Sequence, residues 1–494
     1  MKKQILSAIC LLIAVFASAQ NPVPDEAFIQ KMELIADSLT QHLKEWKVPK
    51  AVFRVEKFGA VADGKTVNTK AIQSAIDLCS RKGGGTVLFR KGEYVTGTIE
   101  LKSNVMLCIA EGAKILGSTC LADYPEKVES FKSVMNEIHK YRISLIYAEK
   151  AINTGICGKG EINFRGEVEH FPGPETISEI EGRPFGIRMI ECKNVVVKDI
   201  TLRNAAAWMQ SYLYCENLIF DGIKVFNHAN YNNDGLDPDG CRNVIVRNCF
   251  ISSHDDAVCL KGASAKPCIN ILIENSTLFS TCNAFKFGTD TQGDFRNIIA
   301  RHLIMGGLPD SLKSFKNRYE CSTGITLATT DGGNVENILI YDVEINRSRC
   351  PVFLCTGSRG RRWNETMQQP GYLKNIVIKN VTGKENRLQG SFITGIKNSV
   401  IENVLIQNLN ISTIGGGSAE MVNLPVDEKE KGYPDAQEFS PSGLPAYGFY
   451  IRNAKNITLE NVKITPETTE QRPEFKSGGN IENVVVNGKT LLTL

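Results

Sequence analysis

The sequence predicts an all-β solenoid, in which successive coils of chain stack as a parallel β-helix. One phrase recurs, in which Asn opens a run of mostly aliphatic residues and a second aliphatic pair follows an Asp or Asn. Six intervals between successive copies are 23 to 28 residues and three are 38 to 53, which is typical of one coil per repeat with loops inserted in some coils. The ten copies begin at Asn194, Asn217, Asn243, Asn270, Asn297, Asn337, Asn375, Asn403, Asn456 and Asn483.

Each repeat contains short runs of Val and Ile at alternating positions, and turns rich in Asn, Gly and Asp separate these runs. This alternation is typical of β-strands, and no repeat contains an amphipathic window of helix length. Because a single coil cannot bury its apolar face, stacking on neighbouring coils is the expected solution. The recurrent Asn fits this fold, since stacked Asn side chains can hydrogen-bond the turn backbone and one another.

The N-terminus indicates an export signal over residues 1–19. Lys2 and Lys3 precede an apolar run from Ile5 to Phe16, and the small residues 17–19 follow it. We therefore expect an exported protein, periplasmic or extracellular. The run is too short to span a bilayer, and no later run of about 18 apolar residues occurs, so we expect no membrane span.

A polar, helical extension is expected over residues 20–50, and the β-helix domain over residues 51–494. Residues 69–82 show the apolar spacing of an amphipathic helix, which the glycines at 83–85 end. The end of a stack of strands is an unpaired sheet edge that needs to be covered. We therefore place this helix as a cap over the N-terminal end of the solenoid.

The net charge of the chain bears on its expected partners, and the positions of its cysteines bear on whether they form disulfides. The formal charge of +3 is small for 494 residues, so we expect no nucleic-acid partner. We also expect a monomer.

The chain has 15 cysteines, of which Cys192, Cys215, Cys241 and Cys268 each stand two residues before a repeat Asn. We expect stacked, buried thiols at this position in place of disulfides, because free Cys is often buried as a small apolar residue.

Stacking in register also brings acidic residues together. Residues one interval apart lie about 4.8 Å apart on neighbouring strands, and alternate residues face outward. One predicted outward row consists of Asp237, Cys259, Lys286, Thr326 and Phe353. A row at the strand entrance consists of Asp234, Asp256, Asn283 and Thr323, with Asp255 one residue before Asp256. Three carboxylates, Asp234, Asp255 and Asp256, should therefore meet on two adjacent coils.

Hydrolysis of a glycosidic bond needs this kind of cluster. One protonated acid serves the leaving oxygen and one ionised base activates water, and neighbouring acids push each other's pKa values apart. The alternatives for the same residues are a Ca²⁺ site or ordinary turn acids, because Asn-Asp-Gly and Asp-Asp also favour turns.

The chain resembles glycoside hydrolase family 28, the polygalacturonase family, whose members are right-handed β-helices. The likeness rests on the opening motif at residues 58–64, on Gly83-Gly84-Gly85-Thr86-Val87 and on Asn232-Asn233-Asp234-Gly235 followed by Asp255-Asp256, 21 residues on. The resemblance implies Asp255 as general acid, Asp234 and Asp256 as the pair that holds and deprotonates water, and an inverting attack on a pectic chain. It implies no cofactor and no metal.

Two family motifs differ here. The family's Gly-His-Gly falls on Cys282-Asn283-Ala284, and its Arg-Ile-Lys falls on Thr326-Leu327-Ala328, so the bases that receive a uronate are absent. We expect Lys286 to replace them, together with an arginine-rich stretch that includes Arg347, Arg349, Arg359, Arg361, Arg362 and Trp363. The predicted substrate-binding set is Asn232, Asp237, Asn283, Lys286 and Arg349.

Two other functions stay open at the level of sequence. A calcium-dependent pectate-type lyase would use Lys286 as base and would release a product with a conjugated double bond. A non-catalytic glycan-binding β-helix would bind a glycan without turnover.

The repeat has long interruptions at 122–183, 306–323 and 415–447. We expect these insertions to narrow the substrate cleft and to favour exo action or short oligosaccharides.

Overall fold

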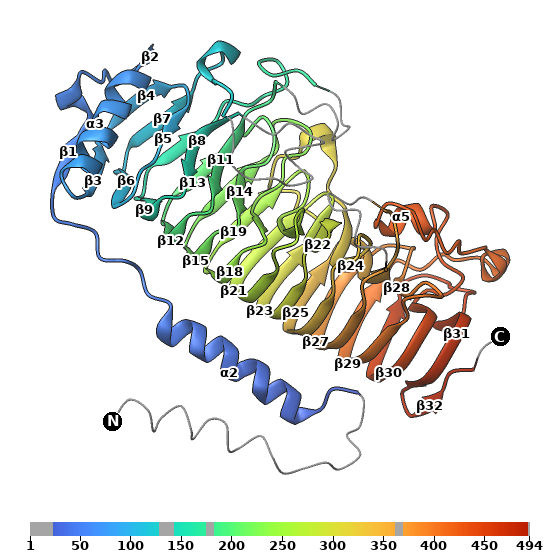
Figure 1. Cartoon of the computed structure of the whole chain (residues 1–494). Helices are drawn as coiled ribbons and strands as arrows, with labels where there is room; N and C mark the ends of the chain where they lie inside the picture. The colour runs from blue at the N-terminus through green and yellow to red at the C-terminus, as the bar shows by residue number, and fades with distance from the viewer. Residues whose placement is uncertain (1–22, 128–142, 174–181, 361–368, 493–494) are drawn as a thin grey trace, which may run out of the picture.

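The protein is a right-handed parallel β-helix, as predicted (Figure 1). The computed structural model describes residues 23–127, 143–173, 182–360 and 369–492. The predicted export signal, residues 1–19, lies outside these described residues. Within them, no helix is both long and apolar enough to cross a membrane.

Up to residue 262 each coil contributes three short strands. Their bounds are β1 (Val52–Arg54), β2 (Asp63–Val67), β3 (Gly85–Phe89), β4 (Gly92–Thr96), β5 (Ile99–Glu100), β6 (Val105–Ile109), β7 (Ala113–Gly117), β8 (Ser144–Glu149), β9 (Ile152–Cys157), β10 (Glu161–Asn163), β11 (Phe185–Ile190), β12 (Lys193–Lys198), β13 (Thr201–Arg203), β14 (Gln210–Leu213), β15 (Glu216–Asp221), β16 (Lys224–Asn227), β17 (Asp237–Asp239), β18 (Arg242–Arg247), β19 (Phe250–Ser253) and β20 (Val258–Gly262).

In the later coils two of the three strands merge, since β21 pairs with both β18 and β19. The later strands are β21 (Cys268–Ser280), β22 (Asn283–Thr291), β23 (Phe295–Gly306), β24 (Cys321–Thr329), β25 (Val335–Asn346), β26 (Ser348–Thr356), β27 (Leu373–Asn386), β28 (Ser391–Thr394), β29 (Ile401–Thr413), β30 (Phe449–Pro466), β31 (Phe475–Val486) and β32 (Lys489–Thr490). Only β32 pairs antiparallel to its neighbour among the described strands.

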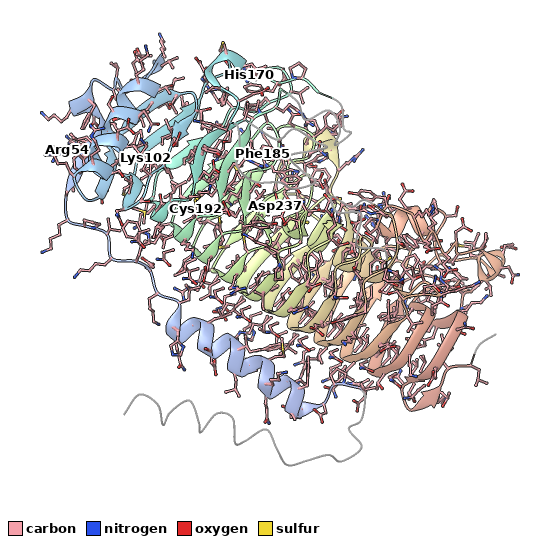
Figure 2. The ribbon with its side chains drawn as sticks, in the orientation of Figure 1. Arg54, Lys102, His170, Phe185, Cys192 and Asp237 are labelled. Atoms are coloured by element: carbon pink, nitrogen blue, oxygen red, sulfur yellow. The ribbon has the colours of Figure 1, made fainter. Side chains whose placement is uncertain are left out.

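One face of the solenoid carries the predicted carboxylates, and we call it the site sheet. It consists of β5, β8, β11, β14, β17, β20, β22, β24, β26 and β28, paired in that order. Its register confirms the predicted outward row, because Cys259 pairs with Lys286, Lys286 with Thr326, and Thr326 with Phe353. Figure 2 shows Asp237 of this row among the central coils.

The repeated Asn residues form a continuous hydrogen-bonded ladder along the solenoid. Each Nδ2 donates to the Oδ1 of the Asn on the preceding coil at 2.8 to 3.4 Å. All of these residues have φ between 52° and 62°, a left-handed conformation that Asn tolerates better than most residues. The ladder begins two coils before the first predicted copy, at Asn104 and Asn153.

The interior is filled by the inward-facing residues of all the strands. Val258 and Leu260 pair with Phe285 and Phe287, as expected, and all four side chains are fully buried. The 14 described cysteines are free thiols. Cys192, Cys215, Cys241 and Cys268 are buried, which confirms the predicted stack of thiols at this position in the described part of the chain.

Two helices lie outside the coils. α3 (Thr69–Arg81) covers the N-terminal end through Ile72, Ala75, Ile76 and Cys79, as predicted. α2 (Glu26–His42), in the N-terminal extension, begins at the N-cap Asp25, whose carboxylate accepts from the backbone N–H of Phe28. It runs along the side of the solenoid and buries an outward apolar stripe that includes Ile245, Leu272, Ile299 and Leu339. A short helix, α5 (Ala436–Phe439), lies within the 415–447 insertion.

The Asn ladder yields a test of stability. Asn270→Ala should lower the free energy of unfolding by about 2 to 3 kcal/mol, because it loses amide hydrogen bonds and places Ala in a left-handed conformation. Asn270→Gly should cost about 1 kcal/mol less, since Gly adopts this conformation readily. Urea unfolding of both variants measures the difference. Equal losses would mean that the positive φ has no part in the preference for Asn.

Candidate active site

Four aspartates and two lysines converge on the site sheet at β17, β20 and β22. Asp234 stands just before β17, Asp255 and Asp256 stand just before β20, and an isolated bridge between Leu236 and Val258 holds the two segments in register. Asp234 and Asp256 are each only 2% exposed. The three predicted carboxylates therefore lie on two adjacent coils, as expected, with Asp255 more exposed than the other two.

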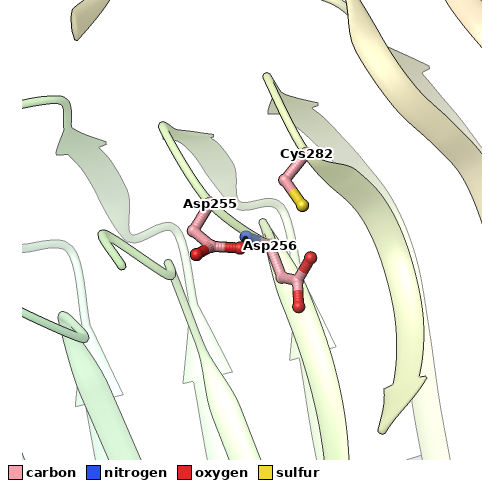
Figure 3. A group of neighbouring side chains, drawn as sticks. All are labelled: Asp255, Asp256 and Cys282. Carbon is pink, nitrogen blue, oxygen red and sulfur yellow. Dashed lines mark hydrogen bonds between the residues drawn. The ribbon is translucent and has the colours of Figure 1, made fainter. Parts of the chain in front are cut away.

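Asp255, Asp256 and Cys282 form the tightest group (Figure 3). One carboxylate oxygen of each aspartate and the Cys282 Sγ all lie within 4.8 Å of one another. The backbone N–H of Asp256 donates to Oδ1 of Asp255 at 3.0 Å. This bond orients the Asp255 carboxyl and leaves its second oxygen available for a proton.

Asp256 is held as a carboxylate. Burial alone would raise its pKa, but the ammonium groups of Lys286 and Lys261 and a hydrogen bond from Asn283 outweigh burial and hold the pKa below its usual value. Lys286 Nζ lies 3.0 Å from Asp256 Oδ2, and Asn283 Nδ2 donates to Oδ1 at 2.6 Å. Asp256 therefore carries the negative charge of this pair.

Asp255 has the opposite tendency. Burial and the negative charge of the adjacent Asp256 raise its pKa above the usual value, although Lys286 and Lys261 act in the other direction. The pKa values of two neighbouring carboxyls are thus shifted in opposite directions, toward the acid form in Asp255 and toward the ionised form in Asp256. This is the division that general acid–base chemistry needs.

Lys261 is a member of the cluster that sequence reasoning missed. Its Nζ lies 3.2 Å from Asp234 Oδ2, 3.6 Å from Asp237 Oδ1 and 4.0 Å from the centre of the Trp208 ring. Burial raises the pKa of Asp237 to about 8 and that of Asp234 well above its usual value, even beside this ammonium. The alternation that placed Lys286 outward on β22 also places Lys261 outward on β20, so the signal was present.

The predicted binding residues have different surroundings from those expected. Lys286 is 2% exposed, and its ammonium binds Asp256. Asn283 positions Asp256 and accepts a hydrogen bond from Thr326 at 3.0 Å. Asn232, with φ of 50°, accepts from the buried Arg183 at 2.9 Å and so shapes the turn before Asp234. Asp237 is fully buried beside Lys261.

The predicted arginine-rich stretch divides into three parts. Arg349 lies apart from the aspartates, and its Nε is 3.2 Å from Glu320 Oε2. Arg359 is buried, and its guanidinium pairs with Asp331 through two nitrogens. Arg361, Arg362 and Trp363 lie outside the described residues.

The 415–447 insertion supplies one wall of the site, which the sequence did not assign residue by residue. Thr289 Oγ1 donates to the Tyr433 hydroxyl at 2.6 Å, and Lys286 Nζ lies 5.6 Å from the centre of the Tyr433 ring. Asp435 caps α5, and burial raises its pKa. Gln437 Nε2 donates to Ser322 Oγ at 2.9 Å. The segment 433–437 therefore crosses the site sheet beside the aspartates.

The same insertion covers the site sheet beyond the cluster, and we call residues 433–447 the lid. Ala436, Phe439 and Leu444 of the lid are buried against Phe353 and Phe392, whose outward-facing rings are fully buried. The centres of the Phe353 and Phe439 rings lie 5.5 Å apart. The floor of the site sheet is therefore closed from β26 onward.

A family model described as glycosyl hydrolases family 28 matches residues 103–284. This range includes Asp234, Asp255, Asp256 and Asn283. Among curated proteins, a "Probable polygalacturonase" of Vitis vinifera is 24% identical over 373 residues, which cover 72% of this chain and 73% of that protein. An "Exo-poly-alpha-D-galacturonosidase" of Dickeya chrysanthemi is 28% identical over 270 residues, covering 45% and 44%.

Solved structures show the same fold. An exopolygalacturonase from Thermotoga maritima has a TM-score of 0.69 at 19% identity and covers 88% of this chain and 96% of its own. A family 28 exopolygalacturonase from Yersinia enterocolitica has a TM-score of 0.66 at 18% identity, with 90% and 79% covered. At such identities the likeness concerns the path of the backbone.

The buried charges of the cluster predict a pH-dependent defect. Lys261→Met should destabilise the protein by about 3 to 5 kcal/mol near pH 7.5, because it leaves Asp234 and Asp237 buried without their cation. These carboxyls would then keep protons in the folded state that the unfolded chain, with pKa values of about 3.9, releases. Stability should therefore fall as the pH rises above about 4, and return toward wild type near pH 4.5.

Thermal unfolding of Lys261→Met at pH 4.5 and pH 7.5 measures this effect. Lys266→Met is the matched control, because Lys266 is exposed and lies only five residues further along the chain. A loss of the same size at both pH values would mean that Lys261 acts through packing and that the charge of the aspartates does not matter.

Proposed function

We propose that the chain is a glycoside hydrolase of glycosyl hydrolases family 28 and that it cleaves glycosidic bonds of a galacturonate- or rhamnogalacturonan-type pectic chain. The observation that carries the proposal is the pair Asp255 and Asp256, adjacent in the chain, whose pKa values are shifted in opposite directions. Such a pair offers a proton and a base within one site.

Each carboxyl has a distinct role in the proposed reaction. Asp255 donates its proton to the leaving oxygen as the bond to the sugar breaks. Asp256, kept ionised by Lys286, takes a proton from the attacking water. Asp234, on the neighbouring coil, has an Oδ1 that is buried without a hydrogen-bond partner among the described residues, which supports a role for this oxygen in holding the water.

We propose an inverting reaction on the ground of the family resemblance. Inverting enzymes separate the acid and the base by roughly 6.5 to 9.5 Å to leave room for water. Asp255 and Asp256 have oxygens within 4.8 Å of each other, so this pair does not itself provide that gap. The water would then lie on the side of Asp234, away from the closest approach of Asp255 and Asp256.

The lid supports exo action or cleavage of short oligosaccharides. A long polymer bound along the site sheet would need an open floor on both sides of the aspartates. Phe353 and Phe392 are instead covered by Phe439 and Leu444. A chain end can enter beside the lid, whereas an internal stretch of polymer would collide with it.

The lyase alternative fits the cluster less well. Calcium prefers six to eight oxygen ligands. Here the Cys282 thiol lies beside Asp255, and the Lys286 ammonium already binds Asp256. A calcium ion bound to the Asp256 carboxylate would have to displace Lys286. Absorbance of a conjugated double bond in the products would nevertheless favour the lyase.

Removing the proposed acid tests the function directly. Asp255→Asn keeps the shape of the side chain but has no proton to donate, so turnover of a pectic oligosaccharide should fall by on the order of 10²- to 10⁴-fold. The circular dichroism spectrum and melting temperature should change little. Asp294→Asn is the control, since Asp294 bonds Arg296 and a turn N–H outside the cluster. Near-normal turnover by Asp255→Asn would remove Asp255 from the role.

Products of a panel of pectic oligosaccharides provide the second test. Proton NMR during the first turnovers should show the inverted anomer, and the first product should be a short unit released from one end. Appearance of the retained anomer first would contradict the inverting mechanism. Early release of internal fragments of mixed length would contradict exo action.

A further inference from the structure

We propose that an arginine-lined cavity beside the catalytic carboxylates binds a uronate carboxylate of the substrate, away from the bond that is cleaved. The inference rests on the proposed function and gives it a specificity site. The cavity has a volume of about 700 Å³ and is bounded by Thr281, which lies in the turn before β22, by Ser322 of β24, by the 306–323 insertion and by Gln437 of the lid.

The register of the site sheet places this cavity on a line with the proposed acid. Asn283 pairs with Thr323, and Thr323 pairs with Cys350, so Cys282, Ser322 and Arg349 form one row on successive strands. Asp255 precedes Asp256 by one residue and heads the same row. At about 4.8 Å per strand, Arg349 is roughly 14 Å from the Asp255 position. A substrate held at Asp255 can therefore reach Arg349 with a sugar further along its chain.

The lining carries an excess of positive charge. Four arginines, Arg318, Arg347, Arg349 and Arg387, face three carboxylates, Asp310, Glu320 and Glu385. The cavity is therefore cationic, whereas the floor beside it holds four aspartates and two lysines. An acidic sugar is therefore attracted to the cavity.

One carboxylate serves two of these arginines. Glu320 Oε2 lies 3.2 Å from Arg349 Nε, and Glu320 Oε1 lies 2.7 Å from Arg387 Nη2. Within the described part of the chain, Arg387 Nε is buried without a hydrogen-bond partner. A guanidinium has five N–H donors, and a pair of them matches the two oxygens of a carboxylate. Arg349 and Arg387 thus have donors left for a second carboxylate beside Glu320.

Two of the residues first expected in this role beside Arg349 already bind aspartates of the protein. Lys286 binds Asp256 at 3.0 Å, and the buried Arg359 binds Asp331. Using either of them for the substrate would leave a buried aspartate without its cation, which is costly. Arg349 and Arg387 have side chains 47% and 38% exposed, so a ligand can reach them at little cost.

Binding measured in the Asp255→Asn background tests the inference without turnover. Trigalacturonate and its methyl ester are titrated calorimetrically into the Asp255→Asn protein and into the same protein with Arg349→Gln and Arg387→Gln added. The dissociation constant for the acid should rise at least about tenfold, the scale of charge-assisted hydrogen bonds, and that for the uncharged ester by less than about twofold. Arg296→Gln, which removes a similarly exposed and paired arginine outside the cavity, should change neither.

Glu320→Gln separates binding from a structural role. It frees both arginines from their shared carboxylate, so it should tighten trigalacturonate binding, whereas a purely structural Glu320 would lead to weaker binding or none. Equal effects of the double variant on acid and ester, no effect on either, or weaker binding in Glu320→Gln would each overturn the inference. If the wild type turns over no pectic substrate but the binding pattern holds, the proposed function alone fails.

Discussion

The register of the parallel strands is the constraint on which the rest of this protein depends. Side chains alternate between core and surface, so a slip of one residue would exchange Phe285 and Phe287 with Lys286. The Asn ladder opposes such a slip, because each amide meets its neighbour only when the turns are stacked in phase. The ladder lies just after the C-terminal ends of the site-sheet strands, whereas Asp234, Asp255 and Asp256 stand before their N-terminal ends, so it fixes the register without contributing to the cluster.

The site depends on this register through charge balance. Three aspartates and two lysines are buried there beside the partly exposed Asp255, and isolated buried charges are strongly unfavourable. Lys261 lies between Asp234 and Asp237, and Lys286 lies against Asp256, each from the strand after the one that carries its partner. The same pairing that makes the cluster tolerable in the folded state also lowers the pKa of Asp256 while that of Asp255 stays raised. Stability and reactivity therefore have a common origin here.

Residue spacing predicted the periodic features of the fold, whereas features that depend on insertions were missed. The solenoid, the thiol stack and the meeting of Asp234, Asp255 and Asp256 are set by the repeat interval, and the capping helix by the apolar spacing of residues 69–82. Tyr433 and Asp435 could not be placed, because no repeat sets the path of a long insertion. Lys286 was placed correctly on the outward row, but spacing does not say whether a cation meets a ligand or a neighbouring carboxylate. The role of α2 was missed because its partners are outward residues of distant coils.

α2 has a mechanical consequence for a protein built of repeats. In a solenoid each coil contacts only its immediate neighbours, so coils can detach from an end one after another. A helix of 17 residues is about 25 Å long, and α2 contacts β18, β21, β23 and β25, which span several coils. Because α2 contacts all four of these strands, the coils that carry them should unfold cooperatively and not one after another. Its docking surface includes Leu339 of β25, so this helix, which is synthesised early, cannot complete its docking until about 300 further residues have followed it.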